Sequence, residues 1–99
     1  MSQHSTYIVF DGDDEAYFDW LDQNPQGFVL NVAKASSDPI VLHQATCRTI
    51  GRNSGRKDGS STANTQYKVV ALTIIELKAW QDPSRSNNEI HPCGTCHPL

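Results

Sequence analysis

The stretch Leu42-His43-Gln44-Ala45-Thr46-Cys47 places a histidine four residues before a cysteine. A second stretch, Pro92-Cys93-Gly94-Thr95-Cys96-His97, contains a Cys-x-x-Cys with a small Gly-Thr filler, which lets two thiolates turn onto one ion. Three thiolates and one imidazole form a closed tetrahedral donor set, the usual arrangement for structural zinc. We therefore predict one zinc site that clamps the middle of the chain to its last residues, with the ligands His43, Cys47, Cys93 and Cys96.

Other interpretations of the same residues stay open. His91 and His97 flank the cysteine pair, and either can replace His43 as the nitrogen ligand. The segment 93–97 also fits the Cys-x-x-Cys-His pattern of c-type haem attachment, and a Cys-x-x-Cys can serve thiol redox chemistry. Taken alone, Cys47 can be a small buried hydrophobe. The joint spacing of the four residues favours zinc.

Length and composition indicate one domain with a modest core. The chain has 99 residues, of which 37% are hydrophobic, so a metal clamp matters more to its stability than in a larger domain. An odd count of three cysteines favours a metal site over a disulfide framework. We expect residues 1–99 to form a single zinc-stabilised domain. No apolar run approaches ~20 residues, and the first residues do not resemble a signal peptide, so we expect a cytoplasmic protein without a membrane contact.

Hydrophobic patterning predicts four strands and two helices. Short β-rich runs occur at 7–10, 28–32, 40–42 and 67–71. Asp13 can cap a helix whose buried face is Tyr17, Trp20 and Leu21. Thr73 followed by Glu76 is a capping box for a second helix, and we expect Asp82-Pro83 to end that helix. We expect 51–66 to be a polar loop and 84–89 a polar linker. The order β-α-β-β-β-α followed by a metal-clamped tail predicts an α+β fold, with one small, mostly antiparallel sheet and two helices.

The charges are distributed unevenly along the chain. Residues 1–42 carry seven acidic side chains against one basic one, whereas 43–99 carry seven basic against four acidic. Four of the cations lie within ten residues beside Gly, Ser and Asn, which let a backbone approach phosphate: Arg48, Arg52, Arg56 and Lys57. This 48–57 loop predicts a nucleic-acid partner, most simply DNA, with the acidic half facing away. The alternative is a solvated loop without a partner.

Catalysis has no comparable pattern in the sequence. On an extended strand, His43 and Cys47 would lie too far apart to act as a base and nucleophile pair. We therefore interpret the protein as a non-catalytic binding module. One alternative is a protein-interaction, adaptor or inhibitor module that uses the acidic helix around Asp13–Asp22 and aromatics such as Tyr17 or Phe18. A further alternative is a metal-dependent hydrolase in which water replaces His43 as a ligand.

The segment 42–50 resembles a Leu-His-Arg-Ala-x-Cys-x-x-Ile segment of a family of small prokaryotic domains of uncharacterised function. The matching stretches that follow are Tyr67-Lys68-Val69-Val70, Leu77–Trp80 and Cys93–Cys96, and Gly27-Phe28-Val29-Leu30-Asn31 resembles the family's preceding strand. Gln44 departs from the basic residue of that pattern. Relatives occur alone or beside restriction-type nuclease domains, so the resemblance implies a metal site and work linked to DNA, but no particular activity.

Overall fold

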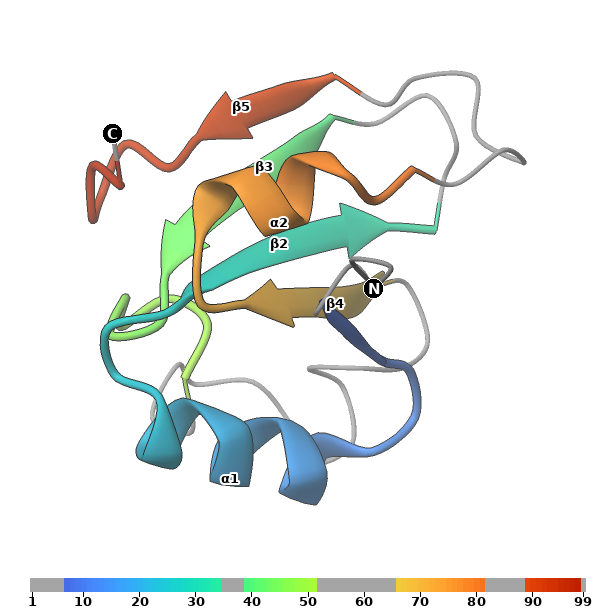
Figure 1. The fold of residues 1–99 in the computed structure, drawn as a ribbon, viewed down its shortest axis with the longest axis vertical. Coiled ribbons are helices and arrows are strands. Elements are labelled where there is room, and N and C mark those ends of the chain that lie inside the picture. Colours follow the sequence, from blue (N-terminus) through green and yellow to red (C-terminus); the bar gives the residue numbers. More distant parts are fainter. Residues whose placement is uncertain (1–6, 35–38, 52–65, 82–88, 99) are drawn as a thin grey trace, which may run out of the picture.

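The computed structural model describes residues 7–34, 39–51, 66–81 and 89–98. Their five strands form one sheet, and two helices pack against it (Figure 1). The elements are β1 (Ile8–Phe10), α1 (Asp14–Gln23), β2 (Phe28–Ala33), β3 (Ile40–Gln44), β4 (Gln66–Ala71), α2 (Ile74–Lys78) and β5 (Ile90–Pro92). The predicted α+β class and the order of the first six elements are confirmed.

The sheet has the strand order β1-β4-β2-β3-β5. Its first three pairings, β1 with β4, β4 with β2 and β2 with β3, are antiparallel, which confirms the predicted mostly antiparallel sheet. Strand β5 was not predicted, because 84–89 is polar and Ile90–Pro92 has no alternating pattern. This short strand pairs in parallel with β3, with Ile40 opposite Ile90 and Leu42 opposite Pro92. Strand β5 thus carries the tail to the end of β3.

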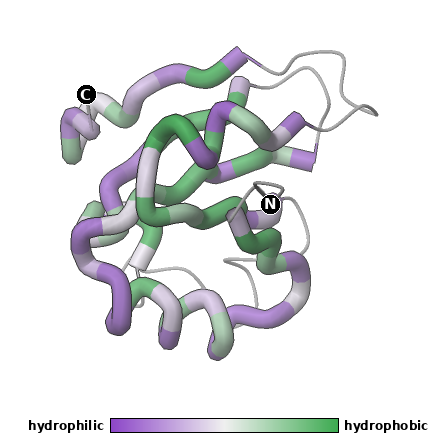
Figure 2. The backbone as a smooth tube through the Cα atoms, in the orientation of Figure 1, coloured by the Kyte–Doolittle hydropathy of each residue, from purple (hydrophilic) through white to green (hydrophobic). Residues whose placement is uncertain are grey.

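The helices cover opposite faces of the sheet. Tyr17 and Leu21 of α1 pack on one face with Val29 and Val70. On the other face, Leu77 and Trp80 pack with residues that alternate with these along the strands, Leu30, Val32 and Val69 among them. The central strands are consequently buried on both sides, and Figure 2 shows them largely hydrophobic, whereas α1 is more hydrophilic.

The predicted helix starts are confirmed, and one predicted helix end is wrong. Asp13 caps α1 by accepting a hydrogen bond from the Ala16 N–H at 3.1 Å. Thr73 caps α2 in the same way for the Glu76 N–H, at 3.2 Å. Helix α2 ends at Lys78, not at the Asp82-Pro83 break. Trp80 lies beyond that end and is still buried, with its ring packed edge-on against Tyr67.

One basic residue of the second half does not belong to any basic surface. Lys68 is fully buried in β4, on the α1 face of the sheet. Its Nζ lies 5.6 Å from the centre of the Tyr17 ring, a distance typical of a cation–π contact. At least one of the seven basic side chains in 43–99 is therefore not available to a partner. Neither helix of the described part of the chain is long and apolar enough to cross a bilayer.

Candidate metal centre

The first half of the centre lies where β3 ends. His43 pairs with Val29 of β2, so its side chain lies on the α1 face of the sheet. The chain turns after Gln44: Ala45 donates a backbone hydrogen bond to Gly27, and the Cys47 N–H donates to the Gln44 carbonyl at 3.0 Å. This turn corrects the expectation that His43 and Cys47 lie far apart on an extended strand. It folds Cys47 back toward His43.

The second half of the centre follows directly from β5. Its parallel pairing places Pro92 opposite Leu42, and the Cys93 N–H donates to the Leu42 carbonyl at 2.8 Å. Residues 93–97 then form a tight turn in which the His97 N–H donates to the Cys93 carbonyl at 3.1 Å. His97 adopts the left-handed conformation with φ 50°. The tail therefore reaches β3 through ordinary sheet hydrogen bonds and ends there in a compact loop that holds both cysteines.

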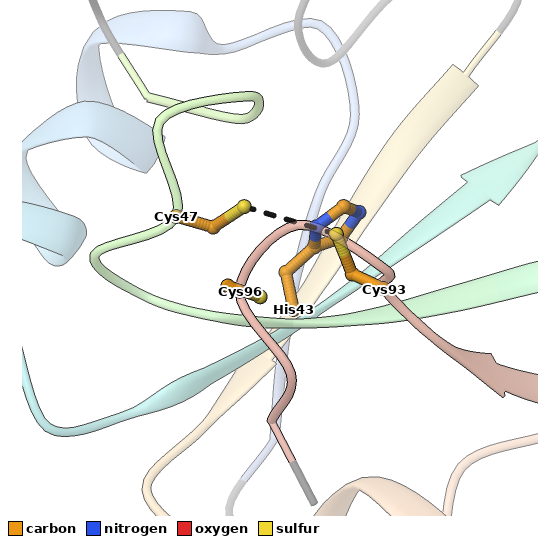
Figure 3. Close-up of side chains that lie close together, drawn as sticks. All are labelled: His43, Cys47, Cys93 and Cys96. Atoms are coloured by element: carbon orange, nitrogen blue, oxygen red, sulfur yellow. Dashed lines mark hydrogen bonds between the residues drawn. The ribbon is translucent and has the colours of Figure 1, made fainter.

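The two halves bring all four predicted ligands together. One donor atom from each of His43, Cys47, Cys93 and Cys96 lies within 4.8 Å of every other. Figure 3 shows the three cysteine side chains and the imidazole gathered at one place, from β3, the turn after it and the loop after β5. His43, Cys47 and Cys93 are only 6%, 4% and 8% exposed, and Cys96 is partly exposed. The described residues contain no other group of this kind.

The spacing of the sulfurs fits a tetrahedral ion. Zn–S bonds of ~2.3 Å at tetrahedral angles separate two thiolates by about 3.8 Å. The Cys47 and Cys93 Sγ atoms lie 3.9 Å apart, which is the dashed contact in Figure 3. His43 takes part in other interactions, but its buried Nδ1 makes no hydrogen bond within the described part of the chain. The donor set and its spacing therefore suit a metal ion, and thiolate-rich sites of this type prefer zinc.

Backbone N–H groups point at two of the sulfurs. Thr95 donates to the Cys93 Sγ at 3.3 Å, and Gln44 donates to the Cys96 Sγ at 3.2 Å. Such bonds favour the thiolate, the form of cysteine that binds metal. Burial raises the pKa of Cys93, but hydrogen bonds from the backbone N–H groups of Cys96 and Thr95, together with those from the Cys96 and Cys47 thiols, outweigh burial and lower the pKa to about 7.

Cys96 behaves differently from Cys93 in the absence of a metal. Burial and, to a smaller extent, the neighbouring Cys47 raise the pKa of Cys96 to about 11, against the opposing effect of the Gln44 N–H. Three thiolates confined to one small volume repel each other, so they do not all ionise without a cation between them. A divalent ion would relieve this repulsion and bind all three as thiolates.

The alternative histidines do not join the cluster. His91 is exposed on β5, with Nε2 3.6 Å from a carboxylate oxygen of Glu89. His97 is exposed as well, after the loop that holds the cysteines. Among the described residues, His43 is the histidine whose ring lies near all three sulfurs. The pairing of His43 with Val29 in the sheet thus explains why His43, and not His91 or His97, lies beside the sulfurs.

A cavity of about 520 Å³ borders the centre on the side of α1. Its wall includes Phe18, Leu21 and Asp22 of α1, Cys47 and, next to it, Arg48. Arg48 is exposed, and it is the one predicted nucleic-acid contact that lies in the described ranges. Arg52, Arg56 and Lys57 lie outside the described residues, so their predicted role stays a prediction. Acidic and basic side chains both border this cavity.

The acidic helix presents a different surface from the one expected. Glu15, Asp19 and Asp22 are exposed, and Phe18 is partly exposed. The expectation that Tyr17 is available to a partner is wrong, because its side chain is fully buried between α1 and the sheet. Its hydroxyl donates a 2.8 Å hydrogen bond to the Ile50 carbonyl. Tyr17 therefore fixes α1 to the segment that follows Cys47, which makes it a support of the centre rather than a contact residue.

Sequence reasoning missed two residues that adjoin the ligands. The side-chain amide of Gln44 donates to the carbonyls of Cys96 and His97, at 2.9 and 3.3 Å. The Thr49 hydroxyl lies 3.1 Å from the Cys47 Sγ. Gln44 appeared in the sequence only as a departure from a basic residue, and nothing in its neighbours indicated a partner 52 residues away.

Comparison with protein-family models, curated proteins and solved structures finds no match for this chain. The interpretation of the centre therefore depends on its own geometry.

Proposed function

We propose that this protein is a zinc-stabilised, non-catalytic binding module. The observation that supports the proposal most directly is the meeting of four donor atoms within 4.8 Å, from segments about half the chain apart. A metal ion there joins the end of β3 to the tail. Three of the four ligands are buried, so the ion contributes to folding as a structural centre does.

The closed donor set supports a structural role over a catalytic one. A catalytic zinc ion keeps one position open for water or substrate, usually with three protein ligands. Here His43 and the three cysteines supply four donors, enough to fill a tetrahedral shell. In a metal-dependent hydrolase, His43 would not bind the ion, and water would take its coordination position. Here this histidine is buried among the sulfurs.

Metal analysis of the purified protein tests the zinc centre. Protein prepared without added metal should contain about one zinc ion per chain, as a closed four-ligand site binds one ion. Cys93→Ser should lose that ion, and its free energy of unfolding should fall by several kcal/mol, because zinc binding is coupled to folding. Thr95→Ser is the matched control, since Thr95 is exposed in the same loop and its side chain is not a ligand. Full stability of the wild type in strong chelator would refute the proposal.

For the partner, we propose a nucleic acid, most simply DNA, bound through the 48–57 loop. Arg48 supports this placement, because it is exposed and directly follows the ligand Cys47. A metal centre would hold the first residues of this basic segment in place. Cations close to such a fixed point can neutralise phosphates with little loss of conformational entropy. A relation to the prokaryotic domains found beside nucleases fits this proposal and is itself a proposal.

Electrophoretic shift assays at two salt concentrations test the partner. Wild-type protein should shift duplex or single-stranded DNA more strongly at low salt. Substitution of one of these cations by Ala should reduce the magnitude of the slope of log affinity against log salt by roughly 0.7–0.9. The four positions are Arg48, Arg52, Arg56 and Lys57. Lys78→Ala is the control, because Lys78 is exposed on α2, across the sheet from α1. Absence of any salt-sensitive shift would favour the alternative, a protein partner at the acidic α1.

A further inference from the structure

We propose that the centre is also a peroxide-sensitive switch, in which oxidation joins Cys47 to Cys93 as a disulfide, expels the metal and leaves the tail covalently tethered. This inference rests on the proposed zinc site and adds a regulation to it. It concerns only the three thiolates, His43 and the cavity beside Cys47.

The geometry favours this pair of sulfurs. Their Sγ atoms lie 3.9 Å apart, against about 2.05 Å in a disulfide, so closing the bond needs a shift of about 2 Å shared between two side chains. The two cysteines are 46 residues apart and lie in two different loops. A bond between them therefore replaces the metal as the connection between the turn after β3 and the tail. A bond between Cys93 and Cys96 would close within one loop and make no such connection.

Access to the pair comes through Cys47. This residue is 4% exposed, yet it forms part of the wall of the 520 Å³ cavity beside α1. Hydrogen peroxide is only slightly larger than water, so a cavity of that size admits it readily. The Thr49 hydroxyl, 3.1 Å from the Cys47 Sγ, is placed to hydrogen-bond a reagent that approaches the sulfur. Cys93 is 8% exposed and does not border this cavity, so we assign the first attack to Cys47.

The chemistry balances with peroxide as the oxidant. The Cys47 thiolate attacks one peroxide oxygen, the O–O bond breaks, and hydroxide leaves with its electron pair to give a sulfenic acid. The Cys93 thiolate then attacks the Cys47 sulfur, the S–O bond breaks, and a second hydroxide leaves. Two thiolates lose two electrons in total, and one peroxide is reduced to two hydroxide ions. Only Cys96 and His43 then remain as ligands, too few for a stable zinc site.

Peroxide treatment of the zinc-loaded full chain tests the switch. Zinc content is measured first, so that failure of the zinc proposal is seen separately. Peroxide is then added stepwise, released zinc is followed with a chromogenic chelator, and the product is digested with trypsin under non-reducing conditions. The Cys47–Cys93 bond links two peptides, 35–48 and 86–99, whereas a Cys93–Cys96 bond lies inside 86–99. We expect about one zinc ion released for each linked pair, and its rebinding after reduction.

The variants separate the switch from a general loss of structure. Cys96→Ser keeps both reacting sulfurs and should still give the linked peptides, even where its zinc affinity is low. Cys47→Ser should give none. Zinc-loaded protein that ends with a Cys93–Cys96 bond, or with sulfinic acids, would overturn the switch and leave the zinc centre intact. Protein that never binds zinc would overturn both.

Discussion

Gln44 holds Cys96 at two points: its backbone N–H donates to the Cys96 Sγ at 3.2 Å, and its side-chain amide donates to the Cys96 carbonyl at 2.9 Å. One residue at the end of β3 thus positions both the sulfur and the backbone of a candidate ligand 52 residues later in the chain. Outer contacts of this kind orient ligands and tune their affinity for the metal. Gln44 therefore belongs to the centre although it supplies no donor atom.

Gln44→Ala should weaken zinc binding by about 10–100-fold, the usual effect of losing an outer contact to a metal ligand. The substitution removes the side-chain hydrogen bonds to Cys96 and His97 but keeps the backbone N–H that points at the sulfur. Competition with a chelator of known affinity measures the change. Gln26→Ala is the control, because Gln26 is exposed and lies outside the cluster. Equal affinities in the two variants would show that the side chain of Gln44 has no part in the centre.

His43→Ala should abolish tight zinc binding, whereas His97→Ala should leave it nearly unchanged. The difference follows from placement, since His43 lies with the sulfurs and His97 is exposed after them. Cobalt substitution provides the measurement, because tetrahedral cobalt sites have intense visible absorption that changes with the ligands. If His97→Ala changed the spectrum and His43→Ala did not, the assignment of the nitrogen ligand would be wrong.

Much of the fold could be predicted because its signals are local. A few consecutive residues are enough to recognise a helix cap or a β-rich run. The caps Asp13 and Thr73 and all four predicted β-rich runs are present in the structure. The grouping of His43, Cys47, Cys93 and Cys96 could be predicted for a related reason. Cysteine and histidine are rare enough in this chain that their spacing alone restricts the choice. What these signals lack is any information on contacts between distant segments.

The features that sequence reasoning missed all depend on such distant contacts. Strand β5 exists because its backbone pairs with β3, and no pattern in Ile90–Pro92 records that pairing. Lys68 is buried because its register places it under Tyr17, whereas a charged side chain in a sequence indicates solvent. The spacing of Tyr17, Trp20 and Leu21 placed Tyr17 on the buried face of its helix, but the hydrogen bond from its hydroxyl to Ile50 depends on the packing of α1 and could not be predicted.

Reaction with iodoacetamide should modify Cys93 before Cys96 in zinc-free, reduced protein at pH 8. The pKa of Cys93 is lowered to about 7, so this thiol is mostly ionised at pH 8, while that of Cys96 is raised to about 11, so it stays protonated. Only the thiolate reacts. The Cys93 rate should rise with pH up to about pH 7 to 8 and then level off. Tandem mass spectrometry locates the label, and two rates that rise together toward pH 9 would indicate an unfolded site.

Tyr17→Phe should lower the free energy of unfolding by about 1–3 kcal/mol, the cost of leaving a buried carbonyl without its hydrogen bond. The lost bond is the 2.8 Å contact from the Tyr17 hydroxyl to Ile50, which joins α1 to the segment after Cys47. Because that segment directly follows the proposed ligand Cys47, zinc should also dissociate faster from the variant. Urea denaturation of the zinc-loaded protein measures the first effect, and transfer of zinc to a chelator measures the second. Tyr7→Phe is the matched control, because it removes the hydroxyl of a partly buried tyrosine on the opposite face of the sheet. A variant that loses stability but releases zinc at the wild-type rate would show that α1 supports the fold without supporting the centre.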